Sequence, residues 1–97
     1  MSDLIDRWMN EPTITRSLDD EGNIYGIRII GRGEHLFFQE NDDALICEID
    51  AAHGVIYSRS VKDWNTKGKM KNDEKKRVVG LIEFYYKKYL NENVVLM

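Results

Sequence analysis

Residues 24–59 read IYGIRIIGRGEHLFFQENDDALICEIDAAHGVIYSR, and this stretch decides the fold. Short runs rich in β-branched and aromatic residues alternate with clusters of Gly, Asn and Asp, which is typical of strands separated by tight turns. The predicted strands are residues 24–30, 35–39, 44–49 and 55–59. Because the connections are short, we expect consecutive strands to pair in antiparallel order, as a meander.

Towards the N-terminus, the sequence predicts one more strand and a short helix. Residues 13–18 form the strand, and residues 19–23 (DDEGN) form the turn that joins it to the meander. Before them, the apolar residues of segment 4–9 recur at helical spacing. Pro12 ends this helix, because the residue before a proline avoids the helical region.

Towards the C-terminus, the pattern changes after the last predicted strand. Residues 61–64 indicate one helical turn, and the polar, lysine-rich residues 65–71 indicate a loop. Asn72 or Asp73 caps a long helix that runs to about Leu90. Its apolar stripe, which is expected to face the sheet, consists of Val78, Leu81, Ile82, Tyr85 and Tyr89.

Length and composition support one α+β domain spanning residues 1–97. A chain of 97 residues suffices for one sheet packed on a helix or two, and not for a second core. We therefore expect an antiparallel meander of about five strands, with the short N-terminal helix and the long C-terminal helix packed on it. The apolar tail, residues 94–97, either frays or adds an edge strand.

The sequence predicts a protein of the cytoplasm. No apolar run approaches the length of a membrane helix. Residues 1–6 lack the basic start and apolar stretch of a secretory signal. Cys47 is the only cysteine, so it has no partner for an internal disulfide, which fits a reducing compartment.

Two of the predicted turns carry acidic residues and contain no base. In a meander, alternate turns lie at the same end of the sheet, so these turns are expected to share an end. The six carboxylates are Asp19, Asp20, Glu21, Glu40, Asp42 and Asp43. Such a cluster creates a negative field that steers a basic partner towards it. The simpler interpretation is that Asp and Asn stand there because they suit turn geometry.

The second half of the chain has the opposite charge. Residues 1–57 hold 12 acids and 4 bases, whereas residues 58–97 hold 5 acids and 10 bases. The candidate nucleic-acid contacts in this half are Lys62, Trp64, Lys67, Lys69 and Lys71, with the tryptophan stacking on a base. A solvated loop and a contact with an acidic protein surface are the other interpretations. The whole-chain charge of −3 opposes nucleic-acid binding.

Nothing in the sequence resembles a catalytic or metal centre, so we predict no enzyme, no metal and no cofactor. His35 and His53 are not spaced as a ligand pair. Cys47 lies between apolar residues of a predicted strand and is interpreted as a core residue. Gly31–Arg32–Gly33 lacks the helix that follows a phosphate-binding loop, and indicates a bend between strands.

Four segments of the chain together resemble a family of bacterial immunity proteins. They are residues 27–33 (IRIIGRG), 37–40 (FFQE), 56–64 (IYSRSVKDW) and 73–82 (DEKKRVVGLI). The family comes from polymorphic-toxin and contact-dependent growth-inhibition systems, and the similar part covers about two thirds of this chain. Its binding face diverges quickly, so no toxin-contacting residue is carried over.

The resemblance implies a small cytoplasmic protein that binds a cognate toxin domain and performs no chemistry. The partner would be a toxin that acts in the cytosol, with a nuclease as the first candidate. Nuclease domains are commonly basic because they bind phosphates, so the acidic turns would complement one. The residues themselves leave two other functions open, a small nucleic-acid-binding protein and an adaptor module for another bacterial protein.

Overall fold

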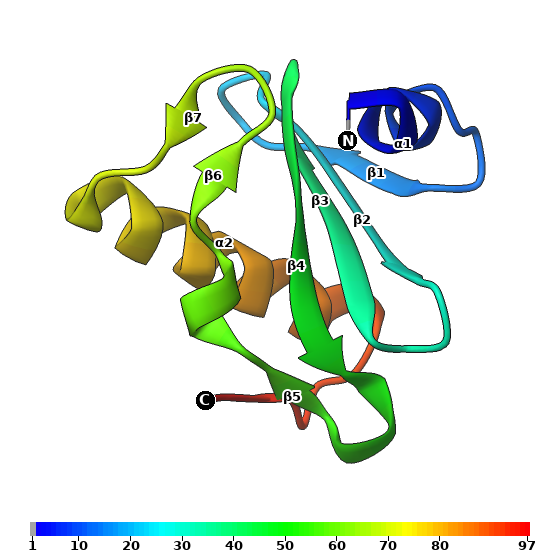
Figure 1. The fold of residues 1–97 in the computed structure, drawn as a ribbon. Coiled ribbons are helices and arrows are strands. Elements are labelled where there is room, and N and C mark those ends of the chain that lie inside the picture. Colours follow the sequence, from blue (N-terminus) through cyan, green and yellow to red (C-terminus); the bar gives the residue numbers. More distant parts are fainter. Residues whose placement is uncertain (1) are drawn as a thin grey trace.

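A six-stranded sheet lies between two helices (Figure 1). The computed structural model describes residues 2–97, with side chains from Leu4 onward. The sheet order is β1 (Thr15–Leu18), β2 (Ile24–Ile30), β3 (His35–Glu40), β4 (Asp43–Asp50), β5 (Val55–Ile56) and β8 (Val95–Leu96). The helices are α1 (Ser2–Met9) and α2 (Asn72–Tyr89), with short 3₁₀ helices η1 (Ala51–His53) and η2 (Ser58–Ser60). The predicted α+β class is confirmed.

Strands β1 to β4 form the antiparallel meander that the alternation of strands and turns predicts. The end of the sheet differs from the expectation in one respect. β5 is only two residues long, because the chain turns into η2 where the sequence predicted strand up to residue 59. The vacant edge is taken by the C-terminal tail, since β8 pairs in parallel with β5, with Val55 opposite Val95. The tail therefore adds an edge strand.

The segment between η2 and α2 is a small hairpin, so the helical turn predicted at 61–64 was wrong, and the loop predicted at 65–71 contains one short strand. β6 (Asp63–Trp64) pairs with β7 (Gly68–Lys69), and Gly68 has a φ of 72°, which glycine adopts without steric cost. Val61 and Trp64 are buried in the main core. Their three-residue spacing is the same as in a helical turn, but here the two side chains anchor an extended segment to the core.

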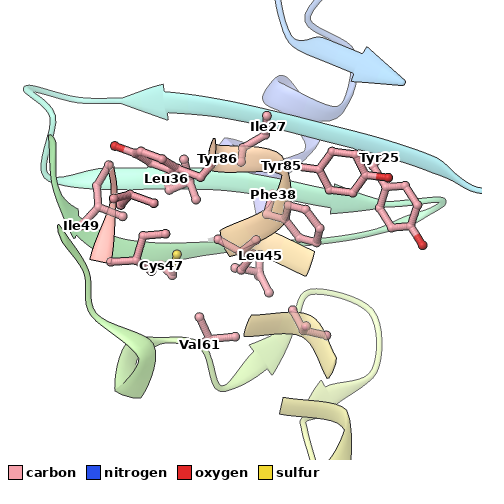
Figure 2. Packing of buried hydrophobic residues seen from close by; sticks show 14 of the residues in the cluster. Tyr25, Ile27, Leu36, Phe38, Leu45, Cys47, Ile49, Val61, Tyr85 and Tyr86 are labelled. Atoms are coloured by element: carbon pink, nitrogen blue, oxygen red, sulfur yellow. The ribbon is translucent and has the colours of Figure 1, made fainter. Parts of the chain in front are cut away.

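The main core fills the space between the sheet and α2 (Figure 2). Phe38 and Leu36 of β3 pack there with residues of the neighbouring strands, against Ile82 and Tyr86 of α2. Within the predicted stripe, Val78, Ile82 and Tyr85 are buried, Leu81 is partly buried and Tyr89 is exposed. Tyr86, which the stripe omits, is only 1% exposed. The fully buried row follows the four-residue spacing 78, 82 and 86. Because this row winds slowly around the helix, residue 89 no longer faces the sheet.

A second cluster covers the opposite face of the sheet under α1. Phe37 belongs to it and is fully buried, although its neighbour Phe38 faces α2. Arg16 secures the C-terminal end of α1 by donating hydrogen bonds to the carbonyl oxygens of Trp8 (3.2 Å) and Met9 (2.8 Å). These bonds satisfy acceptors that a helix end leaves free. Both faces of β3 are therefore covered, which explains its continuous apolar run.

The helix α2 begins as the charge pattern predicts, but without the predicted cap. Lys71 occupies the N-cap position and makes no capping bond through its side chain, so the expectation of Asn72 or Asp73 as cap was wrong. Asp73 and Glu74 still stand in the first turn, and two lysines stand in the last turn, as the helix dipole favours. Neither α1 nor α2 is long and apolar enough to cross a membrane.

Candidate protein-binding site

The two acidic turns lie together at one end of the sheet. Tyr25 is opposite Glu40 in the β2–β3 pair, which places the end of the first turn beside the start of the second. Asn41 joins the turns, because its Oδ1 accepts a hydrogen bond from the Ile24 N–H (2.9 Å) and its Nδ2 donates to Asn23 Oδ1 (3.1 Å). We call this region the acidic end. It holds Asp19, Asp20, Glu21, Glu40, Asp42 and Asp43.

In the first turn, one carboxylate organises the backbone and two point to solvent. Asp19 accepts hydrogen bonds from the Glu21 N–H (2.9 Å) and from both the backbone N–H (2.8 Å) and Nδ2 (2.9 Å) of Asn23. The side-chain bond from Asn23 is the largest of the causes that lower the pKa of Asp19. Asp20 and Glu21 are exposed, and their carboxylates contact no donor among the described residues.

In the second turn, a lysine from the β6–β7 hairpin neutralises one carboxylate. Lys67 Nζ lies 2.9 Å from Asp43 Oδ2, and the Thr66 hydroxyl donates to Asp43 Oδ1. Burial raises the pKa of Asp43, but the hydrogen bonds from Lys67 and Thr66 outweigh it, so the net shift is downward. Asn41 takes a φ of 53°, a left-handed value that Asn tolerates better than most residues. Asp42 is exposed and has no partner within residues 2–97.

Arg77 of α2 clamps the remaining carboxylate of the turns. Its guanidinium donates two hydrogen bonds to Glu40, at 2.7 and 2.8 Å, and its Nε donates to Glu74 Oε1 at 2.8 Å. Glu74 Oε2 also accepts the indole N–H of Trp64 at 3.1 Å. This network fixes α2 and the hairpin against the β3–β4 turn, so the acidic end is held in one shape.

The sequence did not indicate that Lys67 and Arg77 lie at the acidic end, and Lys67 was assigned instead to the candidate nucleic-acid contacts. Arg77 is 37 residues from Glu40 along the chain, and no local pattern links them. With Glu74 included, seven carboxylates face two bases, which leaves an excess of five negative charges. Three of the six predicted carboxylates are engaged internally, and Asp20, Glu21 and Asp42 are free for a partner.

An exposed apolar pair adjoins these free carboxylates. Leu18 and Ile24 flank the first turn and are directly opposite each other in the β1–β2 pair, so their side chains lie on one face. Leu18 is 70% exposed and Ile24 is 39% exposed. An apolar centre bordered by charged groups is the usual composition of a protein–protein interface. The acidic end therefore offers both contact area and charge.

The Glu74 contact gives an expected difference between the two tryptophans. Trp64→Phe removes the indole donor and leaves Glu74 without that bond, which is expected to cost about 1–3 kcal/mol. Trp8→Phe removes an indole N–H that has no acceptor among the described residues, so it is expected to cost about 1 kcal/mol or less. Urea unfolding of both variants measures this, and equal losses would contradict the assigned role of Glu74.

The same network predicts acid sensitivity. Arg77, followed by Trp64, lowers the pKa of Glu74 from 4.5 to about 2 in the folded protein. Glu74 therefore stabilises the fold fully above its unfolded pKa, and this contribution is lost as pH falls from about 4.5 towards 2. Glu74→Gln is expected to show a shallower fall in unfolding free energy between pH 6 and pH 3, measured by urea titration. An unchanged slope would contradict this.

Two of the five candidate nucleic-acid contacts are engaged within the fold. Trp64 is 4% exposed and its N–H is bonded, so the expectation that it stacks on a nucleic-acid base is wrong. Lys67 is paired with Asp43. Lys62, Lys69 and Lys71 are exposed and have no ion-pair partner in the part of the chain that the structure describes. The nucleic-acid hypothesis thus loses its aromatic platform and one of its cations.

The cysteine and the two histidines stand in three separate surroundings within residues 2–97. Cys47 is buried and free, and burial raises the pKa of its thiol to about 12, which keeps it protonated. His53 lies in a surface pair with Asp50, at 2.8 Å. His35 is exposed on β3. Residues 2–97 contain no group of three or more His, Cys, Asp or Glu placed to hold a metal.

Comparison of the chain with protein-family models, with curated proteins and with solved structures gave no match. Function is therefore inferred from the molecule's own surface. Of the regions described above, the acidic end combines free charge, exposed apolar area and a rigid frame.

Proposed function

We propose that the chain is an immunity protein, which binds a cognate cytosol-acting toxin domain through the acidic end and neutralises it without chemistry. The observation that carries this proposal is the convergence of two rigid acidic turns beside the exposed pair Leu18 and Ile24. The resemblance of four sequence segments to polymorphic-toxin immunity proteins supports the biological role.

The charge of the acidic end favours a basic partner. With Glu74 counted, its excess of five negative charges accelerates encounter with a positive surface, an effect that salt weakens. A nuclease is such a partner, because its substrate-binding surface carries cations that contact phosphates. A protein seated on that surface excludes the nucleic acid, so binding alone suffices to neutralise the toxin.

The rigidity of the acidic end favours tight binding. Asn41 ties the first turn to the second, and Arg77 and Lys67 tie the second turn to α2 and to the hairpin. A surface that is already ordered loses little conformational entropy when a partner docks. The internal ion pairs thus position the free carboxylates, and need not contact the toxin themselves.

The test is co-expression with the C-terminal domain of the protein encoded immediately upstream, with a tag on one partner. We expect the two chains to co-elute as one stoichiometric complex, which weakens as salt is raised. If the upstream domain is made in soluble form and does not co-elute at low salt, the proposal is contradicted. Purified chain mixed with RNA and DNA at low salt is the control, and we expect no binding that competes with the toxin domain.

A further inference from the structure

A second surface, separate from the acidic turns, is an apolar groove on the α1 face of the sheet, with a volume of about 770 Å³. α1 forms one wall, and the β4 edge with the start of the hairpin forms the other. Its apolar lining consists of Leu4, Ile5, Trp8, Ile30, Ile46 and Trp64. The volume lies within the range of sites that bury a ligand.

The β4 edge in this groove has one peptide position without partners. On this side of the strand, the Ala44 N–H donates a hydrogen bond to Asn65 Oδ1 (2.8 Å), and the Ala44 C=O accepts one from the Asn65 N–H (2.9 Å). Glu48 N–H is bonded by the Ser60 hydroxyl at 2.7 Å. Ile46, midway between them, points its N–H and C=O to the same side, because backbone groups alternate along a strand. No group among residues 2–97 bonds them, so Ile46 offers a donor and an acceptor to an incoming peptide.

The groove continues into a smaller hollow of about 390 Å³ that is basic. The two spaces share Glu48, Ser60 and Lys62, and the hollow adds Tyr57 and Arg59. Lys62 and Arg59 are exposed and have no ion-pair partner in the described part of the chain. The hollow itself holds two cations against one carboxylate, so it complements an acidic side chain, whereas the second carboxylate, Asp63, lies in the lining of the groove.

We propose that the groove docks an extended segment of a partner protein, in which a large apolar residue is adjacent to an acidic one. The apolar side chain fills the space between α1 and Ile46. The segment's peptide group bonds the free N–H and C=O of Ile46, and its carboxylate meets Lys62 and Arg59. This docking requires neither the acidic end nor the toxin, so it stands apart from the proposed function.

The test is a nuclear magnetic resonance titration of the labelled full-length chain with capped pentapeptides. The probe is acetyl-Ser-Thr-Phe-Glu-Ser-amide, and its controls carry Ala for Phe or Lys for Glu. We expect the probe to give a saturable shift of the Ile46 amide. The Ala control is expected to bind about tenfold more weakly or worse, and the Lys control about two- to fivefold more weakly or worse.

Two variants of the groove and one matched control complete the test. Leu4→Glu and Lys62→Glu change exposed residues of the groove, so the fold is expected to persist while peptide affinity is lost. Leu18→Glu makes the same change at an exposed leucine of the acidic end, and its peptide affinity is expected to stay unchanged. The docking proposal is overturned if no peptide gives a saturable shift, or if the Ala control binds as tightly as the probe. It is also overturned if the Ile46 amide resonance shifts with protein concentration alone, because that would assign the groove to a second copy of the chain.

Discussion

Replacing Asp20, Glu21 and Asp42 together with lysine is expected to lower the affinity for the cognate toxin domain by about 10- to 1000-fold at low salt. These are the carboxylates of the acidic end that are exposed and make no internal contact, so their reversal changes the field without removing a bond of the fold. The loss is expected mainly in the association rate, measured by stopped-flow mixing at two salt concentrations, with the difference from the wild-type chain shrinking at high salt.

The matched control reverses three other exposed acids, Asp6, Glu34 and Glu92. They change the net charge by the same amount but lie in α1, in the β2–β3 turn and after α2. This variant is expected to associate within about threefold of the wild-type rate, because salt screens the attraction between the partner and charges that lie far from the binding site. If both triple variants slow association equally, net charge and not the acidic end governs the encounter.

Phe38→Ala is expected to lower the free energy of unfolding by about 3–5 kcal/mol. Phe38 is fully buried between the sheet and α2, where its ring stacks on Tyr25 with centroids 6.3 Å apart. Because a domain of this size has about 5–15 kcal/mol in total, the variant is expected to be marginally folded at 37 °C. Urea or thermal unfolding followed by circular dichroism measures the loss.

The control is Phe84→Ala, on the outer side of α2. Phe84 is 57% exposed and lies outside both core clusters, so its truncation is expected to change stability by about 0.5 kcal/mol or less. A loss below about 1 kcal/mol for Phe38→Ala, or equal losses for the two variants, would show that the core is packed differently from this structure.

The meander was predictable because each of its strands and turns has a recognisable pattern in the local sequence. The apolar runs end at Gly, Asn and Asp clusters, and the observed β2 spans residues 24–30, as predicted. The hairpin β6–β7 was not predictable, since Val61 and Trp64 are spaced like a helical turn and only burial in the core reveals their role. The Lys71 cap was missed for a similar reason, because α2 is held by its packing and not by a capping side chain.

The candidate site was predictable in location but not in its composition. Meander topology alone places both acidic turns at one end, and the structure bears this out. Which carboxylates are free depends on Lys67 and Arg77, whose pairing with Asp43 and Glu40 arises only when the hairpin and α2 dock. Such contacts leave no signature in the local sequence, so they could not be inferred before the fold was known.

The most direct test of the account is growth of cells that express the upstream toxin domain. Cells that make the toxin domain alone are expected to stop growing, and co-expression of this chain is expected to restore their growth. The triple variant Asp20→Lys, Glu21→Lys and Asp42→Lys is expected to fail at the same expression level, whereas the Asp6, Glu34 and Glu92 reversal protects. A toxin domain that still kills in the presence of the folded wild-type chain, or full protection by the Asp20, Glu21 and Asp42 variant, would contradict neutralisation through the acidic end.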